Sequence, residues 1–300
     1  MDRGCDRRGI GLTRWVEKAI ACGWGLCLAG SVGAVQVTDD LGVTVDFPSP
    51  PRRIVSLLPA LTEVVCALGE CQRLVGVDRY SNHPDRVRQV PQVGGGLDPN
   101  VEAIVALKPD LVLMATSAQM SGQLRSLGIH VLAMEPKRHA DVKRSLVVMG
   151  QVLGVKTALN VWREIEAGLR AVARSLPPRV RGIRVYFEVN NTPIAAGEAS
   201  FIGETLALLG ARNIVSAEWG PFPSINPEFV VRADPDVIMV GDILYTGVDD
   251  RPGWAGIRAV RRQHVCVFTP GQSDALVRPG PRIAEGARLM AGCLIGKALK

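Results

Sequence analysis

The residues best suited to chemistry in this sequence are aromatic and charged side chains in polar loops, and their types indicate binding. They follow apolar runs that are typical of strands, and the candidates are Tyr80, His83, Trp219, Phe222, Asp274 and Arg278. Aromatic rings offer a large apolar area, and a few polar groups fix the orientation of a ligand. This set suits a large, flat, partly polar small molecule. The alternatives are that His83 is a solvated loop residue and that Trp219 and Phe222 belong to a core.

Signatures of bond chemistry are missing from the sequence. It contains no nucleophile elbow, phosphate-binding loop, zinc-protease motif or dinucleotide fingerprint. Gly94-Gly95-Gly96 opens no GxGxxG pattern, and the four histidines are scattered. We therefore expect a protein that is not an enzyme and has no metal or cofactor of its own. An enzyme with a two-lobed cleft is the alternative, and it would need a nucleophile or an acid–base pair in that cleft.

Two glutamates recur within a repeated segment. Residues 100–114 and 226–240 share Asn, Glu, Val, Pro and Asp at one offset and end in apolar runs. In each copy Asn suits the N-cap of a short helix, and Glu102 or Glu228 lies in its first turn, where the helix dipole favours an acid. Pro-Asp then ends the helix before a buried parallel strand. Each copy predicts one exposed acid, although dipole complementarity alone is an alternative reason for it.

The repeat predicts an α/β fold of two similar lobes with mainly parallel central sheets. A chain of 300 residues suits two domains. We place the first lobe at 35–138, a helical segment at 139–178 and the second lobe at 179–300. Residues 157–176 have apolar positions at helical spacing and predict a rod on the order of 30 Å long. One long helix between two lobes predicts limited closure and a preformed cleft.

Polar loops are expected at the carboxyl ends of the strands, where open α/β sheets bind ligands. One such loop covers residues 78–96 and carries Tyr80 and His83. Residues 269–280, which carry Asp274 and Arg278, are also predicted as a loop. Two lobes that face each other would place both sets around one ligand.

Residues 1–34 are typical of an export segment, with five basic residues before a short apolar stretch. We expect cleavage near Ala34 and a periplasmic protein, and a cytoplasmic amphipathic helix is the alternative.

Without this segment 30 basic residues face 26 acidic ones, a balance that does not indicate nucleic-acid binding. We expect a monomer.

Four cysteines remain after residue 34, and an even number permits disulfides in an oxidising compartment. Cys66 and Cys71 flank a turn at Gly69 and could pair. Cys266 and Cys293 could pair only if the last helix packs on the strand that holds Cys266. Unpaired, buried cysteines are the open alternative.

Four stretches together resemble the helical-backbone periplasmic binding proteins that serve ABC importers for vitamin B12, iron siderophores and haem. They are residues 53–63, 75–84, 101–111 and 273–282, and the resemblance covers about residues 50–296. Within that family the sequence is most similar to the vitamin B12 binders. The resemblance implies a protein that captures a corrinoid and delivers it to the transmembrane subunits of an ABC importer.

The resemblance also implies roles for single residues. Tyr80 takes the place of a tyrosine that contacts the corrin, Phe222 that of a pocket tryptophan, and Asp274 that of an aspartate at the polar edge of the ligand. Glu102 and Glu228 match two glutamates that dock onto arginines of the membrane subunits.

The sequence departs from the B12 binders in two loops. Residues 94–97 and 115–117 carry no tryptophan, where the B12 binders tend to have one. This predicts a roomier pocket or one built for another chelate. A ferric siderophore or haem is therefore the alternative ligand, and the mildly basic charge together with Arg278 leaves an anionic chelate possible.

Overall fold

The computed structural model describes residues 34–190, 193–241, 247–248 and 251–298. The first sheet has four parallel strands in the order β4-β3-β5-β6. Its strands are β3 (Ile54–Ser56), β4 (Leu74–Val77), β5 (Leu111–Met114) and β6 (Val131–Ala133). Its helices are α1 (Pro59–Ala67), α2 (Val101–Ala106) and α3 (Ser121–Ser126). A separate hairpin of β1 (Val35–Thr38) and β2 (Thr44–Phe47) precedes it.

The second sheet repeats this plan with one antiparallel addition. Its order is β11-β10-β7-β8, and β9 pairs beside β7. The strands are β7 (Arg184–Asn190), β8 (Ile194–Ala195), β9 (Arg212–Asn213), β10 (Val237–Val240) and β11 (Val265–Val267). Strands β7, β9, β10 and β11 run parallel, and β8 runs antiparallel to β7. Its helices are α6 (Phe201–Leu208), α7 (Pro227–Ala233), α8 (Arg258–Arg261), α9 (Pro270–Val277) and α10 (Ile283–Ala298).

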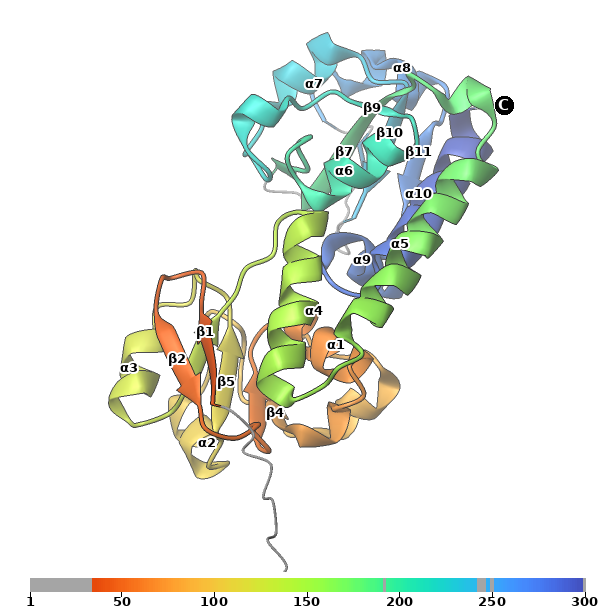
Figure 1. Cartoon of the computed structure of the whole chain (residues 1–300). Helices are drawn as coiled ribbons and strands as arrows, with labels where there is room; N and C mark the ends of the chain where they lie inside the picture. The colour runs from red at the N-terminus through yellow and green to blue at the C-terminus, as the bar shows by residue number, and fades with distance from the viewer. Residues whose placement is uncertain (1–33, 191–192, 242–246, 249–250, 299–300) are drawn as a thin grey trace, which may run out of the picture. The chain divides into compact units, whose positions relative to one another are not determined.

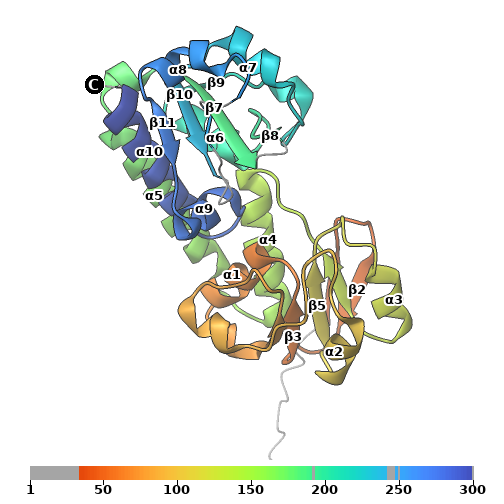
Figure 2. The same ribbon diagram turned by 180° about the vertical axis from the view of Figure 1, so that it is seen from behind.

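Two helices connect the sheets. Helix α4 (His139–Leu153) packs on α1, and α5 (Ala158–Ser175) packs on α4, α6 and α10. Figures 1 and 2 show α5 running beside α10. Gly154 ends α4 with a φ of 74°, a conformation that glycine adopts without a steric penalty. The apolar face of α5 is buried through Trp162, Ile165, Leu169 and Val172, so the predicted long helix is present and its apolar spacing marks its packed face.

One predicted loop is wrong. Residues 269–280 contain α9, whose N-terminus has a capping box between Thr269 and Gln272 and proline at the first position. These two features are readable in the sequence, and together they predict the start of a helix. Asp274 consequently projects from a helix, and Arg278 follows its last turn.

Both cysteine pairs are bonded. Cys66 at the end of α1 joins Cys71, and Cys266 of β11 joins Cys293 of α10. The second bond forms because the last helix packs on β11, which this pairing requires. Among the described helices none is long and apolar enough to cross a membrane. The export segment was predicted at residues 1–34, and its residues 1–33 lie outside the described part of the chain.

Candidate functional site

A cavity of about 460 Å³ lies between the two sheets, at the carboxyl ends of the strands of the first. The residues that follow β3, β4, β5 and β6 all contribute to its lining. The second lobe supplies the opposite side through Phe222, Val277 and Pro279. This is where an open parallel sheet exposes its loops to a ligand, as the sequence predicts.

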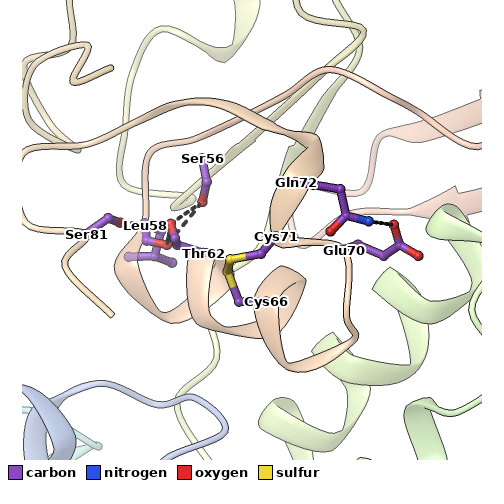
Figure 3. Close-up of a disulfide and its surroundings, with 8 residues drawn as sticks. All are labelled: Ser56, Leu58, Thr62, Cys66, Glu70, Cys71, Gln72 and Ser81. Atoms are coloured by element: carbon purple, nitrogen blue, oxygen red, sulfur yellow. Dashed lines mark hydrogen bonds between the residues drawn. A yellow bond between two sulfur atoms is a disulfide. The ribbon is translucent and has the colours of Figure 1, made fainter. Parts of the chain in front are cut away.

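The loop that carries Tyr80 is held by a buried carboxylate. Asp78 is fully buried and accepts from the main-chain N of Tyr80 at 3.0 Å and from the Ser81 hydroxyl. Ser81 lies 2.8 Å from the hydroxyl of Thr62 on α1, and Figure 3 shows Thr62 in turn bonded to Ser56 of β3. Burial raises the pKa of Asp78, and the bonds from Ser81 and Tyr80 oppose that rise. These hydrogen bonds therefore anchor the loop that carries Tyr80 to α1 and β3.

The cavity lining is mainly apolar, with an acidic excess among its charged groups. Among the described residues of the lining, the ionisable carboxylates are Asp78, Asp98 and Glu135, and Lys137 is the single basic side chain. Asp98 is paired with Arg79 at 2.7 Å outside the lining, and Glu135 accepts from the Thr116 hydroxyl. Gly96 allows its loop to reach the end of β3, because a Cβ there would lie 2.7 Å from the main-chain O of Leu57.

The structure brings two of the six predicted ligand residues to this cavity. Tyr80 lies on the first-lobe side with 60% of its surface exposed, and Phe222 lies on the second-lobe side, where it packs against Phe201 at 6.1 Å between ring centroids. Trp219 does not line the cavity. Its ring packs edge-on against Phe229 of α7, with 4.6 Å between centroids. Trp219 therefore lies on the second lobe, outside the cavity lining.

Three further predicted residues lie at a neighbouring polar junction between the lobes. His83 and Asp274 line a separate pocket of about 310 Å³. Burial, followed by the nearby Arg282, lowers the pKa of His83. Arg278 is buried and turns away from the main cavity. Four acceptors already surround its guanidinium, which weakens the case for an anionic chelate paired with Arg278.

The docking candidates occupy matching places on two helices. Glu102 of α2 and Glu228 of α7 are both exposed in a first turn. Asn100 accepts from the main-chain N of Ala103, and Asn226 from that of Glu228, each at 2.9 Å. The predicted asparagine caps are therefore confirmed, and each helix presents an acid at its start.

Sequence reasoning missed several residues of the cavity. Apolar side chains that line it from the first lobe are Leu57, Leu58 and Leu97, and the charged ones are Asp78, Asp98, Glu135 and Lys137. Leu97, in the 94–97 loop for which the resemblance implies a tryptophan in the B12 binders, is 73% exposed. Asp78, Glu135 and Lys137 come shortly after apolar runs that predict strands, and this pattern could have found these three.

Comparisons with known proteins find relatives of this chain. The sequence matches the periplasmic binding protein family over residues 54–270. It is 31% identical over 278 residues to an uncharacterized ABC transporter substrate-binding lipoprotein, YvrC, of Bacillus subtilis (strain 168), covering 86% of this chain and 87% of the relative. It is 26% identical to the vitamin B12-binding protein of Pectobacterium atrosepticum, covering 79% of this chain and 86% of that protein.

A solved structure shows the same fold. The periplasmic haem-binding protein RhuT from Roseiflexus sp. RS-1, in its apo form, superposes with a TM-score of 0.69 at 25% identity and covers 82% of this chain and 99% of that one. The predicted fold class, two similar α/β lobes joined by a long helix, is confirmed. The relatives are solute-binding proteins, in agreement with the prediction that the chain is not an enzyme.

Proposed function

The chain belongs to the periplasmic binding protein family, and from this premise we propose that it captures a corrinoid, cobalamin in the first place, between its lobes and delivers it to the membrane subunits of an ABC importer. Residues 35–138 and 179–300 form the two lobes of this carrier, and residues 139–178 connect them. It works as a monomer and carries no cofactor of its own.

The observation that carries the choice of ligand is the character of the cavity. Tyr80 and Phe222 offer aromatic area from two lobes, and the leucines extend it. Among the described residues the charged lining groups are three carboxylates and one lysine, and Arg79 already pairs with one of these carboxylates, Asp98. Such a lining favours a flat chelate with a cationic metal core and neutral amide side chains, which is the chemistry of a corrinoid. It disfavours the carboxylate groups of haem, because like charges repel most strongly away from water.

A second candidate ligand is haem or a ferric siderophore. The observation in its favour is the exposed phenol of Tyr80 at the cavity, because tyrosine oxygen is a ligand for ferric iron in some haem proteins. The haem-binding protein RhuT has the same fold, which adds support at the level of architecture.

We also propose that the protein is exported to the periplasm. Two disulfides suit an oxidising compartment. The first described strand begins at Val35, directly after the predicted cleavage position. In this compartment Glu102 and Glu228 would dock onto the membrane subunits.

The deciding experiment is a set of three calorimetric titrations of the exported form with cyanocobalamin, haemin and a ferric hydroxamate. We expect saturable one-to-one binding of cyanocobalamin at micromolar affinity or tighter, on the order of −8 kcal/mol. Haemin or the ferric hydroxamate binding at that strength, with no heat from cyanocobalamin, would move the ligand to the second candidate. No binding of any of the three would remove the chelate proposal.

A further inference from the structure

A buried polar network joins the two lobes beside the cavity. Its centre is the guanidinium of Arg278, which follows α9 of the second lobe. Nη1 of Arg278 donates to Glu63 Oε1 at 3.1 Å and to Asn82 Oδ1 at 2.9 Å. Nη2 donates to the main-chain O of Tyr80 at 2.9 Å and pairs with Asp274 Oδ1 at 2.6 Å. One cation therefore satisfies three groups of the first lobe and one of its own.

The network is desolvated, so it is sensitive to geometry. Arg278 is 8% exposed and Glu63 is 4% exposed. Asn82 also donates to Asp274 Oδ2 at 2.8 Å, which makes a second bridge between the lobes. Removal of one partner from a buried ion pair leaves the other charge uncompensated, and such losses are strongly destabilising. The lobes are thus linked by bonds that tolerate little displacement.

The same residues connect directly to the cavity walls. Val277 and Pro279, the neighbours of Arg278, line the cavity from the second lobe. Tyr80, whose carbonyl receives the Arg278 bond, lines it from the first lobe. The guanidinium therefore ties one wall to the other through the main chain, although it is not itself part of the lining.

The first-lobe end of the network is a carboxylate with an unused acceptor. Glu63 Oε2 has no partner among the described residues, and Arg282 lies 3.8 Å from Oε1. Burial raises the pKa of Glu63 to about 7, and Arg278 and Arg282 oppose the rise. Arg278 therefore favours the ionised form of Glu63. The contact between the lobes has an electrostatic component as well as a geometric one.

We propose that Arg278 is a positioning residue, which holds the Tyr80 wall and the Val277 wall at the separation that the ligand requires. The ligand arm of this inference rests on the proposed function, whereas the positioning itself does not. Arg278 acts from behind the walls, so its loss should weaken binding without removing any surface that touches the ligand.

The test compares Arg278→Met and Arg278→Lys with Arg125→Met. Arg125 is the matched control, because it also pairs with a buried aspartate, Asp39, at 2.6 Å, but within the first-lobe region and away from the cavity. The first readout needs no ligand and is amide hydrogen exchange of residues 79–83. We expect at least tenfold faster exchange there in Arg278→Met, a smaller increase in Arg278→Lys, and none in Arg125→Met.

The second readout is the Kd for cyanocobalamin. We expect at least a tenfold weaker Kd for Arg278→Met, partial recovery for Arg278→Lys and an unchanged Kd for Arg125→Met. If Arg278→Met does not fold, Asn82→Ala replaces it, since that change removes the two bonds of Asn82 and keeps the Arg278 bonds to Glu63 and Tyr80. Unchanged exchange at residues 79–83 in the folded variants would overturn the positioning role. If the wild-type protein does not bind cyanocobalamin, the proposed ligand is refuted. The hydrogen exchange of residues 79–83 would still decide the role of Arg278.

Discussion

His130 and His264 make the same hydrogen bond in the two lobes. The ring Nδ1 of His130 lies 3.2 Å from the main-chain O of Asp110, and that of His264 lies 3.2 Å from the main-chain O of Asp236. Both aspartates stand directly before the strand of their repeated segment, and both histidines precede the neighbouring strand. The correspondence between the lobes thus extends beyond the segments that repeat in sequence.

Two arginines extend the correspondence further. Arg53 donates to the carbonyls at the end of α2, and Arg184 donates to those at the end of α7. Asp110 accepts from the main-chain N of Arg53 at 2.8 Å, and Asp236 from that of Arg184 at 3.0 Å. The Pro-Asp pair of each repeat therefore both ends a helix and anchors the adjacent strand.

The aromatic wall of the cavity gives a first prediction. Phe222→Ala should weaken cyanocobalamin binding by about tenfold to a hundredfold, because burial of an aromatic side chain contributes roughly 1.5–3 kcal/mol. Trp219→Ala is the matched control, since Trp219 lies outside the lining. Calorimetric titration measures both. Equal losses for the two variants would contradict the assignment of the wall.

The exposed acids give a second prediction. The double variant Glu102→Ala/Glu228→Ala should keep its ligand Kd and lose binding to the importer, because both side chains lie outside the cavity. The control is Glu164→Ala/Glu166→Ala, which removes two carboxylates from α5. Uptake in membrane vesicles that contain the importer reports docking. Weaker ligand binding with normal uptake would argue against the docking role.

The buried acid at the lobe junction gives a third prediction, on pH. Burial raises the pKa of Glu63 from its ordinary 4.5 to about 7, against the pull of Arg278 and Arg282. Between these two pH values the unfolded chain releases the proton first, so the Glu63 contribution to stability falls as pH rises through that window. The fall is at most about 3 kcal/mol.

Glu63→Gln tests this prediction, because it keeps the shape of the side chain and cannot ionise. The wild-type Tm should decline relative to that of Glu63→Gln between pH 4.5 and pH 7. Glu102→Gln, a change at an exposed position, serves as the control and should follow the wild type. Parallel curves for the wild type and Glu63→Gln would show that this carboxyl does not titrate in the window.

The disulfides give a fourth prediction. Cys66–Cys71 closes a separation of 5 residues, and Cys266–Cys293 one of 27. The entropy of loop closure assigns about 2 kcal/mol to the first and about 3.5 kcal/mol to the second. Serine replacement of the longer pair should therefore lower the free energy of unfolding more than replacement of the shorter pair. Urea unfolding of both variants measures the difference, and the reverse order would exclude a simple loop-closure account.

Much of the fold could be predicted because it depends on neighbours along the chain. The Asn caps of α2 and α7 and the end of α4 at Gly154 follow from short-range bonds and local backbone preference. The duplication appears in sequence because each lobe needs the same helix end and the same strand start. The start of helix α9 is also local, because Thr269 and Gln272 form its capping box.

The site depended on contacts that no local pattern records. Arg278 has the charge expected of a ligand contact, yet Glu63, which is 215 positions away in sequence, receives one of its bonds. Trp219 has the ring expected in a cleft, yet Phe229 holds it elsewhere. Residue types and spacing set the two lobes and the class of ligand site, because these follow from local bonds and periodicity. Which side chains face the cavity was decided only when the lobes packed, because packing determines which charges find partners and which surfaces stay open.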